Sequence, residues 1–215
     1  RLGMQPAEIE NYKANRSVDW YKKVFQTGLR QDHTVSLSGR KEAVSYFMSL
    51  GYLNNEGIVY GDKFSTVRGR VNLEGQVSKF LKVGVNTQFA DKDESQVPVD
   101  YNMARTLSPW GSEFDDLGEY KWRPNGEASG GNHPYYERQF IDRRVKYTTL
   151  NTTLFADLKL PFGITYRINY TPRYEFYERF NHNSSKHAEW AATGGSSSRQ
   201  NRKTFNWQVD NILKW

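Results

Sequence analysis

Several aromatic side chains lie among Gly, Asn, Asp and Arg in one stretch of the chain, residues 91–143, which shows no sustained hydrophobic period. Flat rings beside hydrogen-bonding groups suit the recognition of sugars or peptides, and aromatic residues are also enriched at protein interfaces. We therefore take five of them as candidate ligand-binding residues, with packing of the stretch onto itself or onto a partner as the alternative. They are Trp110, Tyr120, Trp122, Tyr135 and Tyr136.

Metal binding and catalysis have little support in the residue types. Only His182 and His187 share a loop, and without a regular element that spacing is weak for a metal site, so we expect solvated histidines there and at His33 and His133. Cysteine is absent, which excludes disulfides, thiol catalysis and zinc-thiolate sites. No Gly-x-Ser-x-Gly segment supplies an activated serine. We expect no enzyme activity, no metal and no cofactor.

The element that organises the chain is Phe64–Phe89, two apolar-polar alternating limbs joined at Ser78-Lys79. Alternation with period two places one set of side chains on each face of a strand. Each limb runs for about ten residues, which is the length that a tilted strand needs to cross a bilayer. This pattern predicts strands with an apolar face toward lipid and a charged face toward a wet lumen.

Similar strands precede and follow that pair, to a total of about seven. The connections between them alternate in length: 39–43, 78–80 and 159–163 are short, whereas 54–63, 91–143 and 180–199 are long. Short periplasmic turns and long extracellular loops are typical of outer-membrane β-barrels. The competing interpretation is a soluble β-sandwich, in which alternation separates core from water, but sandwich strands are shorter.

Two regions follow from the pattern. Residues 1–30 are predicted to be a helical lead-in, with one short helix after Pro6 and another from Ser17 to Phe25. Residues 31–215 are predicted to be an all-β, antiparallel, transmembrane barrel segment with large extracellular loops at 91–143 and 180–199. An odd set of seven strands cannot close antiparallel, so we expect a piece of a larger barrel.

Composition limits the other classes. The net charge is +6 and the mean hydropathy is −0.83, with no apolar run of the ~18 residues that a membrane helix requires. The positive charge is spread without a basic run, so no nucleic-acid partner is expected. No signal peptide is visible, which implies either a cytoplasmic protein or a chain that lacks its natural beginning.

Several segments together resemble the SusC/RagA family of TonB-dependent nutrient transporters of the Gram-negative outer membrane. The segments are Asp32–Gly39, Tyr46–Val59, Arg68–Leu73 and Phe80–Gly84. Asp19-Trp20 also looks like the part of that family that follows the plug domain. The resemblance is specific from Asp19 to Ala90, and beyond Ala90 it is one of pattern.

The resemblance implies a 22-stranded barrel of which this chain is roughly the first third. It implies import of oligosaccharides or peptides under a SusD-like surface lipoprotein, in contact with membrane lipid and with the rest of the barrel. Energy would come from the TonB complex through a plug, of which this sequence shows no signature. A soluble β-rich carbohydrate-binding or adhesion module is the alternative.

Charged residues on the predicted lumen face form a second candidate set. Ionisable groups in a membrane-spanning region normally face an interior and pair with one another. We expect the members of this set to pair among themselves or with the plug rather than to bind substrate. They are Arg68, Arg70, Glu74, Arg167 and Arg173.

Overall fold

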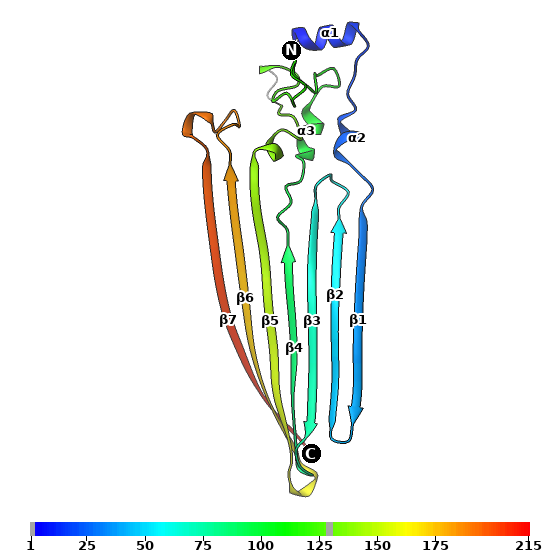
Figure 1. The fold of residues 1–215 in the computed structure, drawn as a ribbon, viewed down its shortest axis with the longest axis vertical. Coiled ribbons are helices and arrows are strands. Elements are labelled where there is room, and N and C mark those ends of the chain that lie inside the picture. The colour runs from blue at the N-terminus through cyan, green and yellow to red at the C-terminus, as the bar shows by residue number, and fades with distance from the viewer. Residues whose placement is uncertain (1–2, 128–130) are drawn as a thin grey trace.

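The computed structural model describes residues 3–127 and 131–215, and it is built around one antiparallel sheet of seven strands (Figure 1). Each strand pairs with the next along the chain, so the order in the sheet is the order in the sequence. The prediction of seven antiparallel strands is confirmed. The strands are β1 (Leu29–Lys41), β2 (Val44–Glu56), β3 (Lys63–Gln76), β4 (Leu81–Asp93), β5 (Ile141–Lys159), β6 (Thr165–Asn183) and β7 (Ser196–Lys214).

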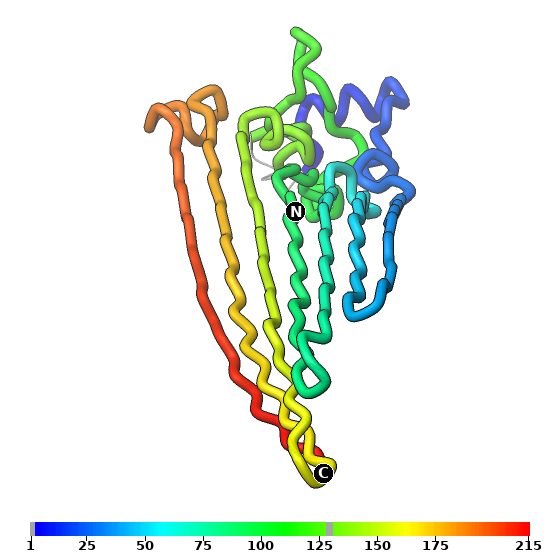
Figure 2. The backbone as a smooth tube through the Cα atoms, turned by 60° about the horizontal axis from the view of Figure 1, so that its bottom comes forward, coloured from blue at the N-terminus to red at the C-terminus, as the bar shows by residue number. Residues whose placement is uncertain are grey.

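The alternation seen in the sequence separates the two faces of this sheet. Outer-face side chains are apolar and uncovered: Val35 is 78% exposed, Leu50 64% and Trp207 64%. A sandwich would bury such a face against a second sheet. The described residues form one curved sheet in which β1 and β7 are not neighbours (Figure 2). The sheet is therefore open, as expected of a barrel segment.

The connections alternate in length as predicted. Residues 42–43, 77–80 and 160–164 form short turns at one end of the sheet, whereas 57–62, 94–140 and 184–195 form longer connections at the other (Figure 1). Two short turns use left-handed backbone, at Glu42 (φ 47°) and at Phe162 (φ 65°). Turns this tight reverse the chain without a long loop, so the faces of neighbouring strands stay in register.

The last three strands are longer than the apolar pattern indicates. β5, β6 and β7 have 19 residues each, against 13 in β1. At ~3.3 Å per residue, 19 residues span roughly 60 Å, about twice the hydrocarbon thickness of a bilayer. Strand pairing needs only backbone groups, so it continues where the apolar alternation has stopped. This shortens the two predicted loops to 94–140 and 184–195.

Three short α-helices lie beyond the long-loop end of the sheet (Figure 1). They are α1 (Pro6–Lys13), α2 (Trp20–Val24) and α3 (Tyr101–Thr106), and single 3-10 turns form η2 (Glu137–Gln139), η3 (Pro161–Gly163) and η4 (Ala191–Thr193). The predicted helix start at Ser17 is wrong, because Asp19 caps α2 by accepting the Lys22 N–H at 3.0 Å. Among the described helices, none combines the length and the apolar run needed to cross a membrane.

A small hydrophobic core joins the lead-in, residues 1–30, to the long connection 94–140, which we call the outer loop. Its buried members are Trp20, Val24, Val99, Ala104 and Leu107. The Trp20 indole N–H donates to the Ser108 carbonyl at 2.9 Å, which fixes α2 against the loop. The stretch 91–143, in which the sequence shows no sustained period, holds α3 and three of the five residues of this core, Val99, Ala104 and Leu107. Helices of five or six residues are too short to leave a clear period.

Candidate functional site: the inner face and the outer loops

The five candidate lumen residues all lie on the inner, polar face of the sheet, and four of them make ion pairs there. Arg167 forms a bidentate pair with Asp157 (Nε–Oδ1 2.5 Å, second N–O contact 2.6 Å). Glu74 accepts from Lys82 Nζ at 2.7 Å and from Ser45 Oγ at 2.9 Å.

Two more arginines are neutralised in the same way. Arg68 pairs with Asp32 and Arg173 with Glu175. The partners are thus other inner-face residues rather than members of the candidate set. Arg70 differs, because no ion pair or side-chain hydrogen bond links it to any described residue.

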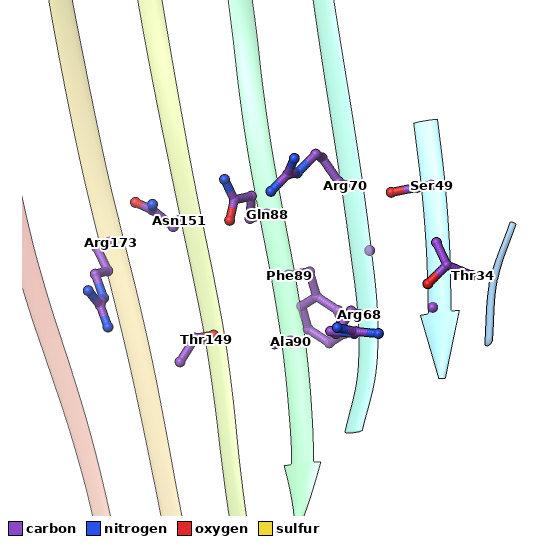
Figure 3. Close-up of a pocket in the computed structure, with 12 residues that line it drawn as sticks. Thr34, Ser49, Arg68, Arg70, Gln88, Phe89, Ala90, Thr149, Asn151 and Arg173 are labelled. Atoms are coloured by element: carbon purple, nitrogen blue, oxygen red, sulfur yellow. The ribbon is translucent and has the colours of Figure 1, made fainter. Parts of the chain in front are cut away.

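Arg70 lies in a recess of about 390 Å³ on the inner face (Figure 3). The recess extends from β1 to β6, and three arginines and several hydroxyl and amide side chains surround it. Its lining residues are Thr34, Ser49, Gly51, Arg68, Gly69, Arg70, Gln88, Phe89, Ala90, Thr149, Asn151 and Arg173. Polar groups from several strands therefore converge on one region of the face.

Strand register explains why these groups meet. Residues paired directly across neighbouring strands form a row that crosses the sheet, and one such row passes through the recess. We call it the middle row: Ser36, Ser49, Arg70, Gln88, Asn151, Arg173 and Asn206. Each member is polar and none is a carboxylate. The row itself therefore offers hydrogen-bond donors and holds no acid, and Arg70 is its one positive charge without an ion-pair partner among the described residues, since Arg173 is paired with Glu175 of the next row.

The outer-loop aromatics form three separate groups instead of one surface. Tyr120 and Tyr135 stack at 5.5 Å and enclose His133, whose ring lies 4.5 Å from that of Tyr120. The Tyr135 hydroxyl donates to the Lys23 carbonyl at 2.6 Å, which ties this group to the lead-in.

The second group links two loops. Trp122 and Tyr136 stack at 6.3 Å, and both contact the ring of His187 from the other long loop, Tyr136 at 5.3 Å. Trp110 stands apart, edge-on to Tyr12 of α1 at 5.0 Å. All five candidates thus pack against rings of this chain. Their role in ligand binding stays a prediction.

The expectation of solvated histidines is wrong for His133 and His187, which are only 1% and 2% exposed. Each Nδ1 accepts a backbone N–H two residues on, from Tyr135 at 3.0 Å and Glu189 at 3.1 Å. Burial, with the nearby charge of Lys23 as a smaller cause, lowers the pKa of His133 to about 4. Apart from Tyr135, the rings around them come from other segments, Trp20 and Tyr120 at His133 and Trp122, Tyr136 and Phe140 at His187, so no local sequence signal marks the burial of these histidines.

Glu137, His187 and Glu189 bring three possible metal-ligand atoms within 4.8 Å of one another. The His187 ring argues against a cation there. Because Nδ1 accepts the Glu189 N–H, the neutral ring carries its proton on Nε2, which lies 4.0 Å from the Glu137 carboxylate. A protonated Nε2 has no lone pair to offer a cation, so this arrangement does not fit a metal centre. At 4.0 Å the Glu137 carboxylate is also too far for a hydrogen bond, and Nε2 has no hydrogen-bond partner among the described residues.

The uncovered apolar outer face, the ion-paired inner face and the turn alternation define a segment of an outer-membrane type β-barrel. No family model matches the chain. Known proteins do match it. The TonB-dependent receptor P26 of Formosa agariphila is 23% identical over 212 residues, which cover 98% of this chain and 21% of the relative. The TonB-dependent receptor SusC of Bacteroides thetaiotaomicron is 34% identical over 74 residues, 34% of this chain and 7% of the relative.

Solved structures show the same fold. The RagAB peptide transporter matches 93% of this chain and 23% of its own, with a TM-score of 0.77 and 20% identity. The RagAB peptide importer in its open-open state matches 91% of this chain and 22% of its own, with a TM-score of 0.70 and 20% identity.

The chain is homologous over most of its length to part of the SusC/RagA-type TonB-dependent receptors. This confirms the family resemblance seen in the sequence. The chain spans only about a fifth of the first of these curated relatives (21%) and less of the second (7%). The matching proteins carry the names of receptors, a transporter and an importer, and none of these names is that of an enzyme.

Proposed function

We propose that this chain forms part of the barrel and outer surface of a TonB-dependent importer in the outer membrane of a Gram-negative bacterium. The observation that carries the proposal is a single antiparallel sheet with a bare apolar outer face and an inner face on which most of the candidate charged residues are ion-paired. Such a sheet is stable where lipid covers one face and a wet interior the other. Homology to TonB-dependent receptors supports the same role.

In this proposal the two parts of the chain do different work. Residues 1–30 lead from a plug domain into the barrel, and residues 31–215 supply barrel strands and outer loops. The plug connects to the TonB complex, which provides energy. A SusD-like lipoprotein closes the mouth over the loops at 94–140 and 184–195. Peptides or oligosaccharides are the cargo, and the name of the RagAB peptide transporter supports peptides.

Outer-loop aromatics are proposed to meet cargo or lid. Of the five candidates, Trp110 and Tyr135 also bind the lead-in, through Asn11 and the Lys23 carbonyl respectively. A ligand or lid that contacts these rings would therefore contact residues that are hydrogen-bonded to the lead-in, residues 1–30. These hydrogen bonds connect the outer loop to the segment that would follow the plug.

The test uses the full-length protein in its native cells. Fractionation and mass spectrometry should find residues 1–215 in the outer membrane, and deletion of the gene should abolish depletion of peptides or oligosaccharides from the medium. Removal of the TonB-binding segment alone should have the same effect as deletion. Recovery of the full-length protein in a soluble fraction, or uptake that persists without the gene, would contradict the proposal.

A further inference from the structure

We propose that the middle row binds the free carboxylate of a peptide substrate, with Arg70 as the charged contact. The inference rests on the proposed import function and names the chemistry of the cargo. It starts from an imbalance: Arg68, Arg167 and Arg173 each have a carboxylate partner on the inner face, and Arg70 has none among the described residues. A guanidinium presents a planar fork of N–H donors that matches a carboxylate in two parallel hydrogen bonds.

Two amides stand beside Arg70 in the same row. Register pairs Arg70 with Gln88 and Gln88 with Asn151, on three successive strands. Figure 3 shows the Arg70 guanidinium extending toward Gln88, with Asn151 on the far side. Neighbouring strands lie ~4.8 Å apart, so the three side chains span roughly 10 Å. One end of an extended peptide fits that span.

These amides also have free hydrogen-bonding capacity. Asn151 Oδ1 is buried without a partner among the described residues, and Gln88 makes no side-chain hydrogen bond to any of them. An amide side chain both donates and accepts, which is what a peptide backbone requires beside its terminal carboxylate. Unpaired buried polar atoms are uncommon in native structures and call for a ligand or another partner.

The carboxylates in the neighbouring rows are already ion-paired and do not compete for Arg70. Asp32 and Glu175 are inner-face carboxylates beside the recess, and each is held by an arginine that lines it. The middle row carries no aromatic ring, and Phe89, the one ring among the residues that line the recess, pairs with Gly69 in an apolar outer-face row, so the middle row itself offers no flat apolar surface to a sugar. The row therefore favours an anionic peptide end over a neutral oligosaccharide.

The experiment expresses the full-length protein in the deletion strain. Two N-acetylated tetrapeptides, identical except for a free carboxylate or a carboxamide at the C-terminus, are supplied together with an oligosaccharide of uronic acids. Depletion from the medium is followed by mass spectrometry. The variants are Arg70→Gln and Arg70→Lys. Arg40→Gln is the matched control, because Arg40 is an inner-face arginine two rows nearer the short turns and outside the recess.

Wild type and Arg40→Gln should deplete the free acid on the order of tenfold faster than the amide, the factor expected for a charge-assisted hydrogen bond. In Arg70→Gln the ratio should fall to near one, and Arg70→Lys should lie between, since lysine keeps the charge without the fork. If immunoblotting shows that Arg70→Gln does not reach the outer membrane, the test uses Arg70→Lys instead.

If Arg70→Gln reaches the outer membrane and its ratio of free-acid to amide depletion is unchanged, the inference is overturned and the import function stays intact. If only Arg70→Lys reaches the membrane, an unchanged ratio in Arg70→Lys has the same meaning. The inference also fails if Arg70 governs uptake of the uronic-acid oligosaccharide but not of the peptides. If wild type depletes none of the three compounds faster than the deletion strain, the proposed function itself fails.

Discussion

Adjacent residues of β6 face different surroundings, and this can be tested one side chain at a time. Ile168 lies on the apolar outer face at 38% exposure, whereas Asn169 faces inward, opposite Asp210. We expect Ile168→Arg to destabilise the full-length protein by about 2 kcal/mol, because the charge enters lipid. Asn169→Arg should be mild, since the new guanidinium meets polar groups. Unfolding midpoints in lipid vesicles measure both, and a larger loss for Asn169→Arg would reverse the assigned faces.

Gly84 lies under an aromatic ring that leaves no room for a side chain. A Cβ at Gly84 would lie 2.4 Å from the Phe155 ring and 2.8 Å from the Leu73 carbonyl oxygen. Gly84→Ala should therefore cost about 1–3 kcal/mol through overpacking. Gly69→Ala is the control, because its Cβ would meet nothing closer than 3.9 Å and should be neutral or slightly stabilising. Equal midpoint shifts for the two variants would contradict the packing seen here.

The outer loop 94–140 should open more easily in acid, because it buries a neutral histidine. The pKa of His133 is about 4 in the folded loop, against 6.5 when the loop opens, so an open loop takes up a proton that the closed loop refuses. The free energy of opening should fall as the pH drops from 6.5 to 4, by roughly 3 kcal/mol in all.

Hydrogen exchange of this loop, corrected for the intrinsic pH dependence of exchange, measures the effect. His133→Gln, which keeps an acceptor and does not titrate, should remove the acid sensitivity. His33→Gln on exposed β1 should keep it. Acid sensitivity that survives His133→Gln would place its origin elsewhere.

These elements differ in how far the sequence alone reveals them. Strands such as β3 and β6 were predictable, because period-two alternation is a local pattern that marks most of β3 and the first two thirds of β6. The helix α3 was not, since six residues carry too little pattern. The burial of His187 depends on rings from another loop, and the missing partner of Arg70 depends on strand register. Both depend on contacts between segments that are distant in the sequence. The residue types of the inner-face set could therefore be predicted from the sequence, but their ion-pair partners could not.

At the scale of the whole chain, the sheet has two free edges. Strands β1 and β7 each pair with a single neighbour among the described residues, and β7 is 19 residues long. Unpaired edges of that length attract other strands. Residues 1–215 produced alone in detergent should therefore associate, as measured by light scattering after size-exclusion chromatography. The full-length protein should stay monodisperse in the same detergent. A monomeric 1–215 chain would show that its edges are protected by other means.

The register that sets the two faces also limits how such a chain can evolve. Deleting one residue within a strand would turn the apolar side chains beyond it inward and the charged ones toward lipid. Insertions between strands at the long-loop end leave every face unchanged. Length differences among descendants of this sequence should therefore accumulate at 57–62, 94–140 and 184–195, whereas the strands change by substitution alone. In the proposed importer, new specificities would then arise mainly by changes in these three connections.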